Sequence, residues 1–319
     1  MLNKKDLRDL IETTLLDIKL TGAAVEKDYY VTQVIHALSD IQNECFRLVF
    51  AGGTCLAKAH RIVDRMSEDI DFKIQINHEK NFTRSRLIKE LKKFRAQIKS
   101  SLAMTDLTTV EDAARNEGKY QRIILKYPHT YPISSTLRPD LLLEFTLSDI
   151  RLSVEDLSVK TIIENVLKKV TLFASPKIPC ISVDETAIEK WVALTRRIVA
   201  IERNYHPDDS ALVRHIYDLN SIIKANKINA NFFTLAQSII INDAKQFKNQ
   251  HPEYSENPSA EIRESLALLK NKIIWKEHYE KFLEEMVYDS STAIEYEKAI
   301  ATIEDISNKI IDSLPYESN

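Results

Sequence analysis

The segment FAGGTCLAKAHRIVDRMSEDIDFKI, residues 50–74, decides the fold of this chain. A short apolar stretch at 47–50 predicts a strand that runs into Gly52 and Gly53, and the residues after the glycines have helical periodicity. The chain has only four glycines, so two adjacent ones indicate a point that needs special backbone geometry. Residues 70–76 then alternate between apolar and polar side chains, which predicts a half-buried strand.

The glycine pair therefore lies on a predicted strand-to-helix turn. Backbone N–H groups at such a turn can bind a phosphate, and the dipole of the helix that follows favours the negative charge. We expect Thr54 to be the N-cap of this helix and to offer its hydroxyl to a phosphate oxygen.

Two carboxylates stand at the start of the second strand. Asp69 and Asp71 are residues i and i+2, so they share one face of a strand about 7 Å apart. Such a pair can bind one or two hard divalent cations, and a third carboxylate from a neighbouring strand would complete the site. Glu144, in the apolar stretch LLLEF at 141–145, is the expected third ligand, and Asp140 is the second choice. A phosphate-binding turn beside metal-binding carboxylates indicates phosphoryl or nucleotidyl transfer.

The rest of the pattern predicts an α+β fold in two domains. Residues 1–175 contain the predicted strands, and residues 176–319 are predicted to be helical, with a break in the helix 259–285 near Trp275. Residues 82–103 predict a helix rich in Lys and Arg, whereas the polar residues 106–119 predict a loop or short helix.

Composition excludes several classes of protein. The formal net charge is −3, so the chain is not strongly cationic, although a local basic patch could still bind nucleic acid. No apolar run approaches the roughly 20 residues that cross a bilayer, and the start of the sequence has no apolar signal-peptide region, so we expect a cytoplasmic protein with no membrane partner. The three cysteines are far apart and are expected to be buried thiols.

The order of these motifs resembles the nucleotidyltransferase superfold, and the residues themselves resemble the AbiEii/AbiGii (MenT-like) toxin family. The family pattern of Gly-Gly-Thr followed by Arg-x-Ser-x-Asp-x-Asp falls on Gly52, Gly53, Thr54, Leu56, Lys58, Arg65, Ser67, Asp69 and Asp71. Weaker matches fall on Glu26, Lys27, Asp28, Glu189, Lys190, Arg197, Arg214 and Asp218, while many members have Asp where this chain has His215.

The resemblance implies a role for each position. Asp69 and Asp71 would bind Mg²⁺, or Mn²⁺ as the alternative ion, and Glu144 would be a third ligand or would accept a proton. By the same resemblance, Lys190 would join these three as a catalytic residue. The nucleoside triphosphate (NTP) would be bound by Gly52, Gly53, Thr54, Lys58, Arg65, Ser67, Lys190 and Asp218. Family members are toxins of two-gene toxin–antitoxin or phage-defence systems, so a cognate antitoxin is an expected partner.

The resemblance also implies an acceptor, the 3′ end of tRNA, and the basic helix at 82–103 would suit a polyanion. Two alternatives remain open at the level of sequence. The chain could modify a protein hydroxyl or a small molecule, or it could bind a nucleotide as a regulator without catalysis.

Overall fold

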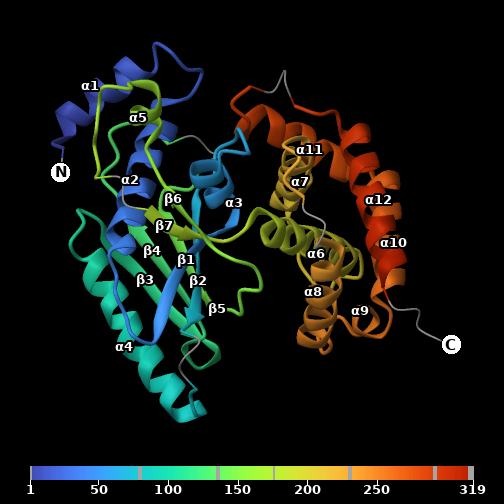
Figure 1. Cartoon of the computed structure of the whole chain (residues 1–319). Helices are drawn as coiled ribbons and strands as arrows, with labels where there is room; N and C mark the ends of the chain where they lie inside the picture. Colours follow the sequence, from blue (N-terminus) through green and yellow to red (C-terminus); the bar gives the residue numbers. More distant parts are fainter. Residues whose placement is uncertain are drawn as a thin grey trace. The chain divides into compact units, whose positions relative to one another are not determined.

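The computed structural model describes residues 2–77, 81–133, 137–174, 177–228, 232–289 and 293–314. The chain divides into two compact units, Met1–Ser182 and Val183–Asn319. The domain boundary predicted at residues 175 and 176 lies outside the described residues. Every strand that the structure describes belongs to the first unit (Figure 1). The predicted α+β fold, with helices following a mixed sheet, is confirmed.

The first unit is a seven-stranded mixed sheet covered by helices. Its helices are α1 (Lys4–Thr14), α2 (Gly22–Ser39), α3 (Gly52–Cys55), α4 (Arg84–Leu102) and α5 (Ile162–Val166), with a π-helical turn η1 (Leu56–His60) and a 3-10 turn η2 (Asn116–Gly118). Its strands are β1 (Phe46–Ala51), β2 (Asp69–Ile76), β3 (Thr108–Arg115), β4 (Tyr120–Lys126), β5 (Leu141–Leu147), β6 (Glu155–Ser158) and β7 (Lys177–Cys180). The strand order is β3-β4-β5-β2-β1-β7-β6, in which the β5–β2 and β1–β7 pairs are parallel and the other pairs antiparallel.

A row of aromatic side chains fixes the register of the three central strands. Phe50 on β1 pairs with Phe72 on β2, which pairs with Phe145 on β5. Their ring centroids are 5.5 Å and 5.7 Å apart, and all three side chains are buried. A slip of one residue would turn these rings to the opposite face, so their burial also determines which residues the opposite face carries.

The predicted loop or short helix at 106–119 is wrong, because β3 pairs with β4 over most of this range. Nearly every residue of β3 is exposed, since the strand lies at the edge of the sheet. An edge strand of this kind does not need alternating apolar residues, so its sequence lacks the pattern that identifies a strand.

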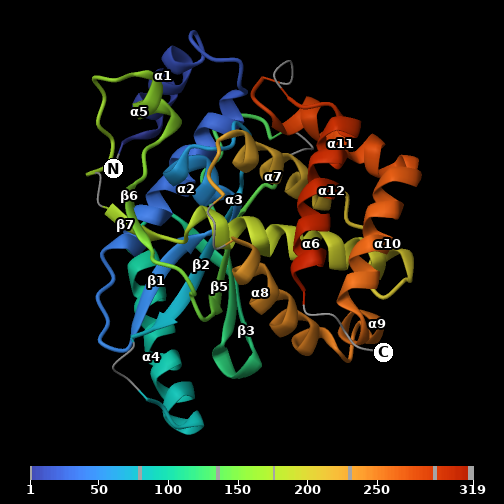
Figure 2. The ribbon, with the colours of Figure 1, turned by 45° about the vertical axis from the view of Figure 1, so that its right-hand side comes forward.

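The second unit consists of helices packed around a long central one. Its elements are α6 (Val183–Glu202), η3 (Ser210–Val213), α7 (Arg214–Lys224), α8 (Phe232–Phe247), α9 (Pro252–Glu256), α10 (Pro258–Asn271), α11 (Ile273–Met286) and α12 (Tyr296–Ser313). Helix α6 contacts α7, α8 and α10 (Figure 2). The fully buried Trp191 on α6 donates its indole N–H to Ser307 Oγ on α12 at 2.8 Å. The predicted break near Trp275 is confirmed and falls at Lys272, between α10 and α11.

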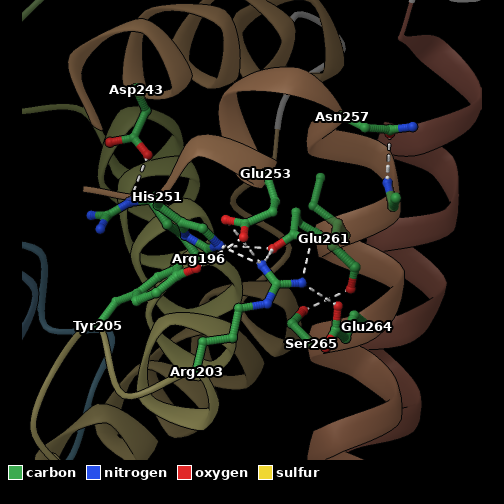
Figure 3. Close-up of polar contacts among 12 residues, drawn as sticks. Arg196, Arg203, Tyr205, Asp243, His251, Glu253, Asn257, Glu261, Glu264 and Ser265 are labelled. Carbon is green, nitrogen blue, oxygen red and sulfur yellow. Dashed lines mark hydrogen bonds and ion pairs between the residues drawn. The ribbon is translucent and has the colours of Figure 1, made fainter. Parts of the chain in front are cut away.

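A cluster of charged side chains joins the end of α6 to α9 and α10 (Figure 3). Arg203 donates from Nη2 to Glu261 Oε1 and to Glu264 Oε2, both at 2.7 Å. The buried ring of His251 lies between these helices, with its Nε2 atom 2.7 Å from Glu261 Oε2. We call Arg203, His251, Glu253, Glu261 and Glu264 the Arg203 cluster. No helix in the described ranges is both long and apolar enough to cross a membrane.

Candidate active site

The predicted glycine turn is confirmed as the junction between β1 and α3. Gly52 is the first residue of α3 and has a φ of +73°, in the left-handed region that glycine adopts without strain. A Cβ atom at this position would lie 2.0 Å from Oδ2 of Asp71. Position 52 therefore requires glycine for two reasons: the positive φ angle and the close approach of the backbone to the Asp71 carboxylate.

The expectation that Thr54 is the N-cap is wrong. Helix α3 begins at Gly52, before Thr54, and its N-cap is Ala51, which has no side-chain capping bond. Thr54 is fully buried, donates its hydroxyl to the carbonyl oxygen of Asp69, and has its Oγ1 atom 2.9 Å from Ser67 Oγ. Its side chain thus ties the glycine turn to the segment that leads into β2.

The two aspartates lie at the start of β2, on the face opposite the aromatic row. Asp71 pairs with Ala51 on β1 and with Glu144 on β5, so the Asp71 and Glu144 side chains are neighbours on one face. The Oδ1 atom of Asp69 is buried and accepts no hydrogen bond from any residue that the structure describes. The guanidinium of Arg138 forms an ion pair with Asp69, in which the Nη1 atom lies 3.7 Å from Oδ1.

Glu144 has a partner that the sequence did not indicate. The hydroxyl of Tyr120 on β4 donates to Glu144 Oε1. Burial, together with this carboxylate, raises the pKa of Tyr120 to about 12, so the hydroxyl remains protonated near neutral pH. Asp140, the second candidate, lies one residue before the start of β5. The role of either carboxylate as a third ligand stays a prediction.

The donor set at β2 fits a hard divalent cation. Magnesium in proteins is usually held by one or two carboxylates, with water and substrate phosphates as its other ligands. Asp69 and Asp71 supply such a pair, and the Asp69 Oδ1 atom, which accepts no hydrogen bond from the described residues, is one available oxygen. Among the described residues, no group of three or more His, Cys, Asp and Glu side chains is placed to hold a metal ion.

The other residues of the motif predicted to bind nucleotide make contacts within the protein. Lys58 forms an ion pair with Asp28, and both side chains are largely buried. Arg65 is buried, and its Nη1 atom donates to the carbonyl oxygen of Met66 at 2.9 Å. A Cβ atom at Gly53 would lie 2.6 Å from the Arg65 Nη2 atom, so Arg65 packs against the glycine turn.

Three consecutive buried charges on α2 support the site from within the protein. Every residue from Ala23 to Ile35 is buried, including Glu26, Lys27 and Asp28. The Glu26 carboxylate accepts the backbone N–H of Thr130, at 2.9 Å to Oε1. The sequence indicated Glu26, Lys27 and Asp28 by resemblance alone. In the structure each of the three side chains contacts a different segment of the first unit.

Lys27 and Asp28 reach the motif residues directly. Lys27 Nζ lies 2.5 Å from Oε2 of Glu68, the residue before Asp69. Asp28 accepts the backbone N–H of Ile162 at 2.7 Å through Oδ2, in addition to its pair with Lys58. Burial lowers the pKa of the Lys27 ammonium, and the Glu68 carboxylate opposes that shift.

The predicted site residues of the second unit are paired with one another. Lys190 on α6 and Asp218 on α7 are both buried, with Nζ and Oδ2 2.8 Å apart. Arg197 forms an ion pair with Asp209. Lys190 and Asp218, the two residues of this unit that were expected to bind the NTP, are thus brought together.

The predicted basic helix is confirmed as α4. Some of its cations pair with acids, as Arg84 does with Glu117 and Lys99 with Asp112. Others, among them Arg86, Lys89 and Lys92, are exposed on its surface.

The cysteines differ from one another in burial. Cys55 and Cys180 are buried as expected, whereas Cys45 is only half-buried. The Cys55 thiol follows Thr54 and lies against that of Cys180 on β7, and burial raises its pKa well above the ordinary value.

Comparison with known proteins identifies the family. No curated protein matches this chain. Among solved structures, the nucleotidyltransferase toxin MenT4 from Mycobacterium tuberculosis H37Rv is similar, with 17% sequence identity and a TM-score of 0.40 over 93% of this chain and 98% of that one. The family of AbiEii nucleotidyl transferase toxins of type IV toxin–antitoxin systems matches residues 37–305, a range that includes most of the C-terminal helices. The resemblance is confirmed, and this chain belongs to the AbiEii family of nucleotidyltransferase toxins.

Proposed function

We propose that the chain is a cytoplasmic, metal-dependent enzyme that transfers a nucleoside monophosphate from an NTP to the 3′ end of tRNA. One observation carries the proposal: the Asp69 and Asp71 carboxylates stand beside the Gly52 turn, where the backbone packs against Asp71. Membership of a nucleotidyltransferase toxin family supports the reaction class and implies an antitoxin partner. We extend this to a role in phage defence.

Asp69 and Asp71 would hold Mg²⁺, or Mn²⁺, and this ion would neutralise charge on the phosphates of the bound NTP. The protein then contributes mainly position and charge. An acceptor hydroxyl forms a bond to the α-phosphorus, the bond to the β-phosphate oxygen breaks, and pyrophosphate leaves. The hydroxyl proton passes to a carboxylate, for which Glu144 is the candidate because it neighbours Asp71 on the same face.

The choice of tRNA rests on two features. The resemblance to the toxin family implies it, and α4 presents exposed cations that would contact an RNA backbone. Phosphate contacts of this kind would make the affinity for RNA fall as salt concentration rises.

The test is a transfer assay with total tRNA, Mg²⁺ and each α-labelled NTP in turn. Wild-type protein should label RNA with one NTP, and Asp69→Asn should abolish labelling because it removes one charge while keeping the shape of the side chain. Omission of the metal should abolish labelling equally. Circular dichroism of the Asp69→Asn variant verifies that it is folded.

Other outcomes redirect the proposal. Binding of NTP without labelled RNA would contradict the tRNA acceptor and favour a protein hydroxyl or a small molecule. Binding of NTP without transfer to any acceptor, even from a cell extract, would favour the non-catalytic regulator.

A further inference from the structure

Arg138 lies at the carboxylate pair and belongs to no motif that the sequence analysis singled out. Its Nη1 atom is 3.7 Å from the Oδ1 atom of Asp69, which is too far for a hydrogen bond. Its side chain is 55% exposed to solvent. An ion pair without a hydrogen bond leaves the donors that face Asp69 able to bind another anion.

The backbone of Arg138 is held from both sides by one buried ion pair. Its N–H donates to Glu68 Oε2 at 2.7 Å, and its carbonyl oxygen accepts from Lys27 Nζ at 2.7 Å. The Lys27 and Glu68 side chains are 0% and 3% exposed. Because Glu68 directly precedes Asp69, the same ion pair sets the position of both the carboxylate and the arginine.

We propose that Arg138 binds a phosphate group of the donor NTP. The proposal rests on the proposed function and adds to it a residue that contacts the substrate. Guanidinium groups bind phosphate through two parallel N–H···O bonds. The backbone of Arg138 is anchored by its two hydrogen bonds, and its side chain is exposed enough to meet a phosphate. A triphosphate that shares a cation with Asp69 and Asp71 would lie within reach of this guanidinium.

The test compares Arg138→Met, Arg138→Lys and a matched control, Arg8→Met. Arg8 on α1 is 56% exposed and lies 2.8 Å from the Glu12 carboxylate, so it matches Arg138 in exposure and in having an acidic neighbour. Equilibrium binding of the NTP and of inorganic tripolyphosphate is measured for each full-length variant, with and without Mg²⁺. The KM values for NTP and for tRNA and the kcat are measured in the transfer assay.

We expect Arg138→Met to weaken binding of NTP and tripolyphosphate, and to raise the KM for NTP, by about tenfold or more. Arg138→Lys should lie between Arg138→Met and wild type, because lysine keeps the charge and loses the two-pronged geometry. Arg8→Met should match wild type.

Three results would overturn the proposal. If Arg138 served only as a counter-ion for Asp69, Arg138→Met would bind Mg²⁺ more tightly and NTP as well as wild type does. A rise in the KM for tRNA alone would assign Arg138 to the acceptor. If wild-type protein binds no NTP, the proposed function fails first, and this proposal fails with it.

Discussion

The two units use buried charge in different ways. In the first unit, Lys27 lies inside the protein and forms an ion pair with the buried Glu68 carboxylate. In the second unit, Arg203 contacts several acidic groups, and one of them, Glu264, is 42% exposed (Figure 3).

The difference predicts how each unit tolerates loss of a charge. A buried ion pair that loses one member leaves the other charge with neither a partner nor water, and this is strongly destabilising. In a shared and partly hydrated cluster, the remaining groups keep other partners or are solvated by water. The Lys27–Glu68 pair should therefore be the more sensitive of the two, and it is also the one that adjoins the candidate active site.

The largest effect is expected for Lys27→Met, which leaves the Glu68 carboxylate buried without its cation. The free energy of unfolding of the first unit should fall by about 3–5 kcal/mol. Urea unfolding followed by circular dichroism measures the loss, while fluorescence reports the second unit alone, because both tryptophans of the chain, Trp191 and Trp275, lie there.

A double variant sharpens this prediction. Lys27→Met with Glu68→Gln removes the stranded charge and retains an acceptor for the Arg138 N–H, so part of the lost stability should return. A single variant as stable as wild type would show that the pair is not needed for stability.

A smaller loss, about 2 kcal/mol, is expected for Arg203→Met. Glu264 can be hydrated, and Glu261 keeps its contact with His251, so neither acid is isolated. Tryptophan fluorescence during urea unfolding is the measurement. A loss as large as that of Lys27→Met would contradict the distinction between an isolated pair and a shared cluster.

A pH-dependent effect is expected at Glu164, whose partners are mainly backbone groups of the first unit. Burial raises the pKa of this carboxyl, but backbone N–H groups of Thr161, Leu172 and Phe173 outweigh burial and hold it below the ordinary 4.5. The unfolded chain then binds more protons, so the stabilisation is complete above about pH 4.5 and is lost as pH falls through the folded pKa.

Glu164→Gln should therefore be less stable than wild type at pH 7, by about 1 kcal/mol. The difference should shrink as the pH is lowered below 4.5. Thermal unfolding at a series of pH values gives the comparison, and a difference that stayed constant with pH would contradict it.

The smallest effect is expected for Arg8→Met. Its ion pair with Glu12 is exposed on α1, where water and salt screen the two charges. The midpoint of unfolding should remain that of wild type at both low and high salt. A salt-dependent shift would show that exposed pairs contribute more than the comparison allows.

Local pattern made much of the fold predictable. Alternation along 70–76 located β2, and the rare glycine pair located the turn, because both signals depend on neighbouring residues only. The edge strand β3 was not predicted, because its pairing with β4 makes it a strand while its own side chains show no alternating apolar pattern.

The sequence located the glycine turn and the aspartate pair on β2, but it did not indicate which side chains contact them. Lys58 pairs with Asp28 from another helix, and Arg138 approaches Asp69 from a distant loop. Such contacts depend on the tertiary fold, and no spacing in the sequence records them. The resemblance gave Lys58 as a nucleotide-binding residue. In the structure Lys58 forms an ion pair with Asp28, so its contact with a nucleotide stays a prediction.

The buried thiol of Cys55 offers a way to measure how often the glycine turn opens. Thiol reagents react with the thiolate, and Cys55 is both enclosed and held in the protonated form. Its alkylation rate therefore measures how often the turn opens, with the half-buried Cys45 as an internal standard for the reagent. A substrate that closes the turn would slow the alkylation of Cys55 and leave that of Cys45 unchanged. The ratio of the two alkylation rates would therefore report closure of the site without catalytic turnover.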